Sequence, residues 1–268
     1  MRKVVYILAI VILLLIFGIS AFQVGSYYLE AHEQAERFDA LAEIKNNAKN
    51  EAVTKETVPE ATFGAVDIRD ENGMLKEYGE IYALNQDLVG WLRIDGTVID
   101  YPVMQTPDSR DFYLKRDFEK NHSERGCIYI REECDINKPS DNITIYGHNM
   151  LDGSMFACLH EYTKQETWEN NPLIIFDTLY EYRVYKIFAV FKTSANLGEG
   201  FSYHQMVDAQ SEEDFNEFIG TCKDLSRSQF YDTGITPVYG DKIICLSTCE
   251  YTMGNGNGRL VVAAYRIS

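Results

Sequence analysis

The residues from Val4 to Val24 form a run of 21 positions without a charged side chain. At about 1.5 Å per residue, a helix of this length crosses a hydrocarbon core of roughly 30 Å. A cleaved signal peptide has a shorter apolar region and a small-residue cleavage site, and no A-x-A pattern follows Val24. We therefore expect residues 1–25 to be an uncleaved, single-pass anchor in the cell membrane. Because Arg2 and Lys3 precede it, the positive-inside rule predicts a cytoplasmic N-terminus and an extracellular remainder.

The chain of 268 residues has a formal net charge of -16 at pH 7. Because neutralising nucleic-acid phosphates requires a basic surface, we expect no nucleic-acid partner. Residues 26–47 contain good helix formers and neither Gly nor Pro, which predicts a juxtamembrane helix. The polar, aperiodic residues 47–63 are typical of a linker. We assign residues 26–73 to this helix and linker, and residues 74–268 to one globular domain.

Short runs rich in Ile, Val, Tyr and Phe recur through this domain. Two flank the turn signal Asp95-Gly96, and the others cover residues 127–130, 142–148, 173–176, 182–193, 242–249 and 259–267. Eight short strands with few long helices predict a mostly β fold with peripheral helices, an antiparallel sandwich or barrel. One helix, from Ser211 to Ser226, is predicted by an N-cap followed by an apolar stripe.

The last two predicted strands carry the first candidates for chemistry. They are joined by nine residues, Glu250 to Gly258, which favours a hairpin over a crossover. In such a hairpin Cys249, at the end of one strand, faces Arg259 at the start of the next. A guanidinium there can favour a thiolate or stabilise negative charge developing on a carbonyl oxygen. The pair indicates a cysteine acyl-transfer site, which also requires a proton donor, most often a histidine.

His148 is the candidate proton donor among the five histidines. It ends the apolar run of residues 142–148 and follows Gly147. The end of a strand next to a glycine is a place where a side chain is held rigidly while it faces a cleft. We therefore group His148 with the cysteine and the arginine of the hairpin.

The six cysteines stand at positions 127, 134, 158, 222, 245 and 249. None forms a C-x-x-C pair accompanied by a histidine pair, so we expect no metal site. An extracellular setting permits three disulfides, but most of these cysteines lie inside apolar runs, which is typical of buried thiols. We expect Cys249 and most of the other five to be free thiols.

These motifs together resemble the sortases of Gram-positive cell walls. The resemblance lies in LSTC ending at Cys249, an arginine ten positions later, and YGHNM with DGSMF about a hundred positions upstream. The chain departs from the family's Thr-Leu-x-Thr-Cys pattern only at Cys245, where the first Thr usually stands. Class B is indicated by DLVGWLRIDGTVIDYPVMQ, by the long helix-bearing connection before the catalytic strand, and by Glu250 directly after the cysteine. The resemblance covers about residues 74–268.

The resemblance implies an eight-stranded sortase-type β-barrel and a cysteine transpeptidase. In such an enzyme Cys249 attacks the carbonyl of the Thr in a C-terminal sorting signal, and a thioacyl-enzyme forms. Arg259 stabilises the oxyanion or positions the peptide, and His148 protonates the leaving amine. The family needs no cofactor, so we expect none.

The resemblance also implies the partners. These are secreted proteins bearing a C-terminal sorting signal, and an amine acceptor on a peptidoglycan precursor or on a lysine of another protein, such as a pilin. Ser247, Thr248 and Glu250 adjoin the candidate nucleophile, and we expect them to contact the substrate.

Two other classes of protein remain open from the sequence alone. A cysteine peptidase would use the same nucleophile with water as the acceptor, and the acceptor depends on a pocket that the sequence does not define. A non-enzymatic, membrane-anchored surface protein would explain the anchor and the β-rich domain. It gives no reason for placing Cys249 opposite Arg259.

Overall fold

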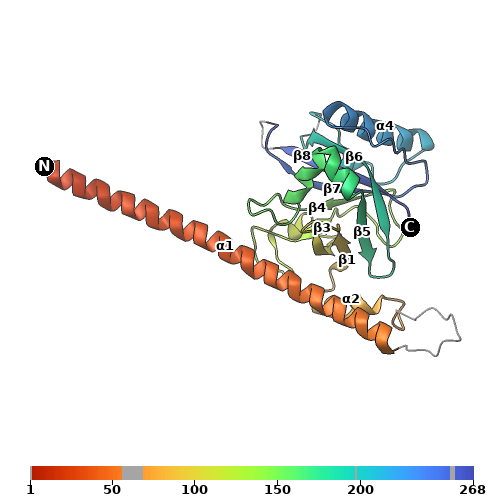
Figure 1. The fold of residues 1–268 in the computed structure, drawn as a ribbon, viewed down its shortest axis with the longest axis horizontal. Coiled ribbons are helices and arrows are strands. Elements are labelled where there is room, and N and C mark those ends of the chain that lie inside the picture. The colour runs from red at the N-terminus through yellow and green to blue at the C-terminus, as the bar shows by residue number, and fades with distance from the viewer. Residues whose placement is uncertain (1, 56–68, 197, 254–256) are drawn as a thin grey trace. The chain divides into compact units, whose positions relative to one another are not determined.

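The computed structural model describes residues 2–55, 69–196, 198–253 and 257–268. Eight strands form a closed barrel (Figure 1), so the eight-stranded barrel implied by the family resemblance is confirmed. The strands are β1 Leu88–Arg93, β2 Asp100–Met104, β3 Ile128–Ile130, β4 Asn142–Tyr146, β5 Leu173–Thr178, β6 Val184–Ser194, β7 Ile243–Glu250 and β8 Gly258–Arg266.

The order of strands around the barrel is β1-β2-β3-β4-β7-β8-β6-β5, and β5 pairs back to β1. Two neighbouring pairs, β2 with β3 and β4 with β7, are parallel. The expectation of an antiparallel sheet was therefore wrong at these two places. Parallel neighbours need long connections, and the chain between β4 and β7 supplies one that includes β5, β6 and a helix.

That helix, α4 (Glu212–Gln229), packs against β6, β7 and β8 (Figure 1). Its N-terminus is capped as predicted, because the Ser211 hydroxyl accepts a hydrogen bond from the Asp214 backbone N–H at 3.1 Å. The predicted apolar stripe is also confirmed, and its buried members are Phe215, Phe218, Ile219 and Cys222. The helix continues to Gln229, beyond the predicted end at Ser226.

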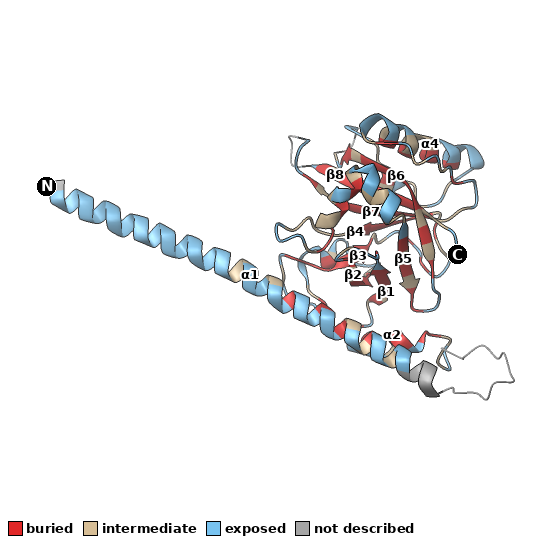
Figure 2. Ribbon diagram, viewed as in Figure 1, coloured by how far each residue is buried: buried red, intermediate tan, exposed pale blue. Residues whose placement is uncertain are grey.

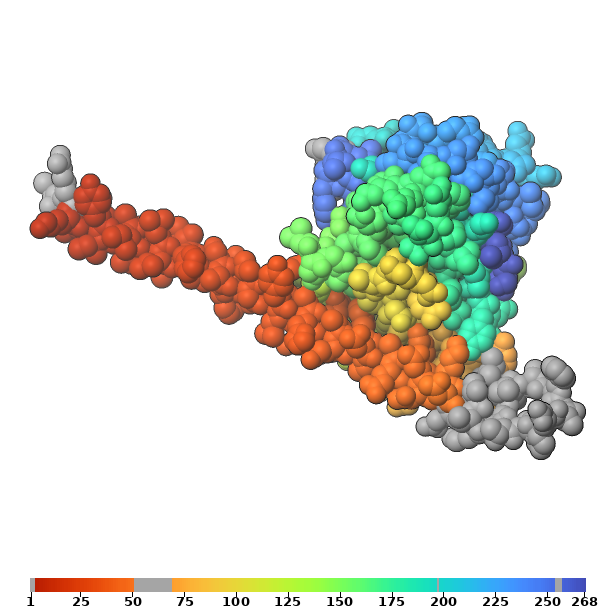
Figure 3. Space-filling view, viewed as in Figure 1, coloured from red at the N-terminus to blue at the C-terminus, as the bar shows by residue number. Residues whose placement is uncertain are grey.

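Shorter helices close the sides of the barrel. They are α2 Lys76–Leu84, α3 Gln165–Asn170 and the 3-10 helices η1 Phe112–Lys115, η2 Ala157–Thr163 and η3 Tyr203–Gln205. The segment of η2 and α3 (green in Figure 3) lies between α4 (blue) and residues near β1 (yellow). Its Trp168 ring lies 5.9 Å from the Tyr231 ring, and the Tyr231 hydroxyl donates to the Tyr162 carbonyl at 2.8 Å.

The chain divides into two compact parts, residues 1–40 and 41–268, and α1 (Arg2–Lys55) contributes to both. From residue 3 to residue 25 the side chains of the helix are exposed, whereas the barrel interior is buried (Figure 2). Within the described residues, Lys3–Asn50 is long and apolar enough to be a candidate membrane span. In the second part Lys45 Nζ lies 3.2 Å from Asp100 Oδ1, so the end of α1 packs on β2.

The predicted juxtamembrane helix is present, but it is longer than expected. Residues 47–55, which we assigned to a linker, continue α1 through Lys55. They contain neither Gly nor Pro, and they include good helix formers such as Ala, Lys and Glu. The rest of the expected linker, up to residue 63, lies outside the described residues.

Candidate active site

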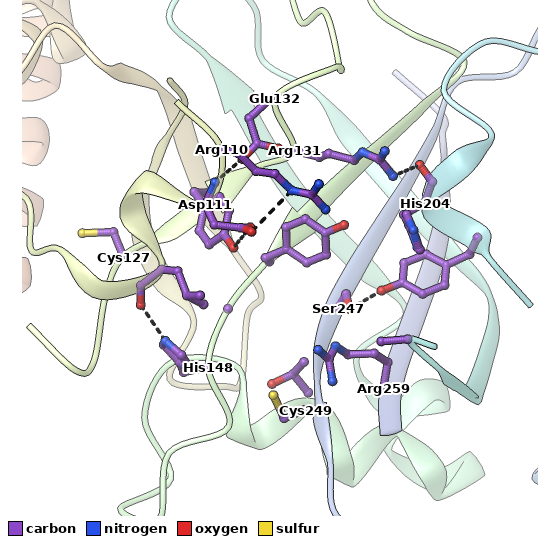
Figure 4. A pocket seen from close by; sticks show the side chains of 17 residues that line it. Arg110, Asp111, Cys127, Arg131, Glu132, His148, His204, Ser247, Cys249 and Arg259 are labelled. Carbon is purple, nitrogen blue, oxygen red and sulfur yellow. Dashed lines mark hydrogen bonds and ion pairs between the residues drawn. The ribbon is translucent and has the colours of Figure 1, made fainter. Parts of the chain in front are cut away.

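One pocket contains the three residues that the sequence singles out for chemistry. Cys249 and Arg259 lie at one end of it, with His148 beside them, and Arg110, Arg131 and Glu132 lie at the other end (Figure 4). The full lining is Arg110, Asp111, Leu114, Cys127, Tyr129, Arg131, Glu132, Tyr146, Gly147, His148, Ala195, Tyr203, His204, Ser247, Thr248, Cys249 and Arg259.

The hairpin of β7 and β8 places Cys249 and Arg259 opposite each other. Their Cα atoms are register partners in the antiparallel ladder, and the next pair is Glu250 with Gly258. A Cβ atom at Gly258 would lie 2.3 Å from the Glu250 carbonyl oxygen, so only glycine fits there. The Arg259 Nη1 donates to the Gly258 carbonyl at 2.8 Å. The predicted facing of the thiol and the guanidinium is therefore confirmed at the level of the backbone register.

His148 lies two residues beyond the end of β4. Its Nε2 is 2.7 Å from the Leu114 carbonyl oxygen, drawn as a dashed line in Figure 4. Because a carbonyl oxygen only accepts, we assign the Nε2 proton to this hydrogen bond. In the neutral ring the lone pair then lies on Nδ1. Gly147 allows the chain to pass the Phe156 ring, since a Cβ atom would lie 2.6 Å from that ring.

The Leu114 carbonyl belongs to η1, and Asp111 directly precedes this helix. Asp111 adopts a left-handed backbone conformation with φ of 51°. Its carboxylate accepts a hydrogen bond from the Tyr129 hydroxyl at 2.8 Å, and its N–H donates to Glu132. These contacts fix the acceptor that orients His148.

Ser247, Thr248 and Glu250 are the three residues that we expect to contact the substrate, and this stays a prediction. Ser247 and Thr248 line the pocket, whereas Glu250 does not. The Ser247 hydroxyl lies 2.5 Å from the Tyr203 hydroxyl. The Thr248 hydroxyl is buried and has no hydrogen-bond partner among the described residues. Successive side chains of a strand point to opposite faces, so Glu250 points away from the face that carries Cys249, and it is 2% exposed.

The end of the pocket far from Cys249 is polar and carries both signs of charge. Arg131 pairs with Glu133 at 2.6 Å and donates to the His204 carbonyl. Partial burial and the nearby Arg131 guanidinium lower the pKa of His204. Within the described residues, no group of three or more His, Cys, Asp or Glu side chains is arranged to hold a metal ion.

All six cysteines are free thiols, and five of them differ from Cys249 in their surroundings. Burial raises the pKa of Cys127, Cys222 and Cys245, and it raises the pKa of Cys134 to about 11. Burial also raises the pKa of Cys158. The expectation that most cysteines are free thiols is confirmed.

Labelling in denaturant without reductant is therefore expected to find six thiols. Under native conditions at neutral pH, Cys249 is expected to react first, because the other five thiols are buried or have a raised pKa. Mass spectrometry after brief alkylation measures both results. Two or fewer thiols in denaturant would reveal disulfides and contradict this prediction.

The family model of the sortase domain matches residues 92–267. The chain belongs to the sortase family. Sortase B of Listeria monocytogenes is 31% identical over 222 residues, which cover 82% of this chain and 86% of that protein. Sortase B of Staphylococcus aureus is 26% identical over 255 residues, 95% of this chain and 92% of that protein. A Staphylococcus aureus sortase B–substrate complex has a TM-score of 0.72 at 24% identity, covering 90% of this chain and 99% of that chain.

The two sortase B proteins place the chain in class B, as the sequence motifs indicated. It is a sortase-type cysteine transpeptidase, and the reading as a non-enzymatic surface protein is set aside. Sortases are membrane-associated enzymes of the cell wall that act on surface proteins carrying sorting signals and on cell-wall amine acceptors.

The sequence alone did not reveal several residues that support this site. The contact of Leu114 with His148 is made by a backbone carbonyl, which carries no side-chain signal. Asn149 and His160 contact the Cys249 carbonyl. Only the position of Asn149 directly after His148 could have drawn attention to it.

Proposed function

We propose that this sortase cleaves a C-terminal sorting signal after its Thr residue and joins the new carboxyl end to an amine. The observation that carries the proposal is the β7–β8 register, which pairs Cys249 with Arg259 at a pocket that also contains His148. We infer that Cys249 is the nucleophile, His148 the general acid and base, and Arg259 the oxyanion donor. The acceptor is an amine of a peptidoglycan precursor or a lysine of a pilin-like protein.

The reaction proceeds in two acyl transfers. The Cys249 thiolate attacks the Thr carbonyl carbon, and the Arg259 guanidinium donates to the oxygen as it becomes negative. Nδ1 of His148 holds the proton that it took from the Cys249 thiol when the thiolate formed. The tetrahedral intermediate collapses, the C–N bond breaks, and His148 donates this proton from Nδ1 to the leaving amine. The acceptor amine then attacks the thioester, its proton passes to His148, and the thiolate of Cys249 leaves.

We also assign Ser247 and Thr248 to substrate contact. Both line the pocket next to Cys249. We keep Glu250 as a third candidate for substrate contact because it adjoins Cys249, although its side chain does not line the pocket.

The location proposed for the enzyme follows from the N-terminal helix. Residues 1–25 anchor it in the membrane with the N-terminus in the cytoplasm, and residues 26–73 connect this anchor to the catalytic domain of residues 74–268. The catalytic domain lies outside the cell, where secreted substrates pass. The candidate span in α1 and the basic residues before it support this orientation.

A peptide library with candidate sorting signals tests the proposed reaction. We expect intact-mass spectrometry to detect the enzyme carrying the N-terminal peptide fragment on Cys249. Adding an amine is expected to discharge this adduct and to yield the amide product. Release of only the free carboxylic acid, even with an excess of amine, would instead support a cysteine peptidase that uses water.

A further inference from the structure

The carbonyl oxygen of Cys249 accepts hydrogen bonds from side chains and not from the backbone of a neighbouring strand. Alternate carbonyls along a strand point the same way, and the Ser247 carbonyl accepts from the Gly147 N–H at 3.1 Å. The Cys249 carbonyl therefore points to the side of β4. Because β4 ends at Tyr146, the end of β7 extends past its partner there.

Asn149 and His160 supply the missing donors. Asn149 Nδ2 and His160 Nε2 each lie 3.1 Å from the Cys249 carbonyl oxygen, and the two nitrogens are 3.0 Å apart. A carbonyl oxygen has two lone pairs and can accept from both. Since the carbonyl only accepts, we assign a proton to His160 Nε2.

Glu250 orients the His160 ring from its other edge. His160 Nδ1 lies 3.4 Å from Glu250 Oε2, which is also 3.0 Å from Lys192 Nζ. Glu250 Oε1 accepts from the Thr252 N–H at 2.6 Å. Burial acts to raise the pKa of Glu250, but the hydrogen bonds from Thr252 and Lys192 outweigh it and lower the pKa to about 2. The carboxylate is therefore a fixed negative charge 3.4 Å from His160 Nδ1.

These contacts connect the two proposed reacting residues through their neighbours in the chain. Asn149 directly follows His148 and holds the backbone of Cys249. Glu250 directly follows Cys249 and holds His160, which returns to the same backbone oxygen. These contacts thus join the residues after β4 to the end of β7.

We propose that Asn149 and His160, oriented by Glu250, form a carbonyl clamp that fixes the Cys249 thiol relative to His148. The proposal rests on the function proposed above, in which Cys249 is the nucleophile. The clamp residues do not line the pocket, so they are positioning residues and not catalytic ones. A displacement of the nucleophile by about 1 Å can cost up to about 10²-fold in rate, which is the scale on which the clamp acts.

Two substitutions of His160 separate its hydrogen bond to the Cys249 carbonyl from its contact with Glu250. A glutamine amide places its nitrogen near the position of Nε2, whereas an asparagine amide places it near Nδ1. His160→Gln therefore keeps the donor to the Cys249 carbonyl, and His160→Asn keeps only a nitrogen that faces Glu250. We expect His160→Asn to slow thioacyl-enzyme formation by about 10-fold to 10²-fold with KM changed less than about twofold. We expect His160→Gln to restore most of the rate.

The rate is measured by rapid-quench intact-mass spectrometry in the full-length enzyme, with thermal unfolding as a check that both variants are folded. His32→Asn, at a surface position in α1 that pairs only with Glu36 in an exposed contact, is the matched control. Equal rates for His160→Asn and the unchanged enzyme would overturn the clamp, and so would equally slow Asn and Gln variants. If Cys249→Ala still forms the adduct, the proposed function itself fails, a result distinct from a fast His160→Asn variant.

Discussion

Cys249→Ala is expected to form no thioacyl-enzyme and to lower turnover by at least about 10³-fold, because removing a nucleophile leaves only binding and the oxyanion donors. Cys249 is the cysteine whose register partner is an arginine, and it lies at the pocket together with His148. Intact-mass spectrometry with a sorting-signal peptide measures the adduct, and product formation with an added amine measures turnover.

Cys158→Ala is the matched control for this experiment. Cys158 is also partly exposed, but it does not line the pocket, and burial raises its pKa. We expect the control to keep turnover within about twofold of the unchanged enzyme. An adduct on Cys249→Ala, or equal losses in the two variants, would show that the nucleophile has been misassigned.

The strands and the final hairpin could be predicted because their signals are local. Runs of β-branched and aromatic residues bounded by turn residues mark each strand, and the nine residues from Glu250 to Gly258 are too few for a crossover. The hairpin in turn fixes which residue faces Cys249, so Arg259 followed from counting. The N-cap at Ser211 was equally local, since it depends on four neighbouring residues.

The parallel pairing of β4 with β7 could not be predicted in the same way. About a hundred residues separate the paired positions, such as Tyr146 and Ser247, and no turn relates their registers. His148 was nevertheless placed at the site, because its strand-end position and the family motif agree. What orients its ring stayed unknown, since Leu114 contributes a backbone oxygen that any residue type could supply.

Glu250 shows that a position in a motif does not fix where a side chain points. Its position directly after the nucleophile made a substrate contact the natural expectation. The alternation of side chains along β7 turns it to the other face, where Lys192 and His160 surround it. The alternation of side chains along a strand can be predicted from the sequence. The residues that stabilise the buried carboxylate, Lys192 and His160, come from β6 and η2, which are distant in the sequence.

Two segments of the connection between β6 and β7 have different roles. The apolar stripe of α4 is buried against the barrel, which accounts for that part of the helix by packing alone. The pocket receives Tyr203 and His204 from η3 instead. Of this long connection, it is therefore the residues before α4 that are placed to contact a bound peptide.

Arg259→Lys is expected to lower the rate of thioacyl-enzyme formation by about 10²-fold or more, the loss that follows removal of one oxyanion donor. The substitution keeps the positive charge but replaces a planar fork of donors with a compact ammonium. The guanidinium also donates to the Gly258 carbonyl. The single ammonium group of a lysine would have to donate both to this carbonyl and to the substrate oxygen. Single-turnover kinetics with a sorting-signal peptide measures this rate.

Arg266→Lys makes the same chemical change at the other end of β8 and serves as the control. Arg266 contacts Glu181 and the Ser268 carbonyl at the surface, away from the pocket. An exposed ion pair of this kind contributes about 0–1 kcal/mol, so the control is expected to stay within about twofold in rate. If Arg259→Lys is as fast as this control, charge alone is sufficient near Cys249. The planar geometry of the guanidinium would then have no part in stabilising the oxyanion.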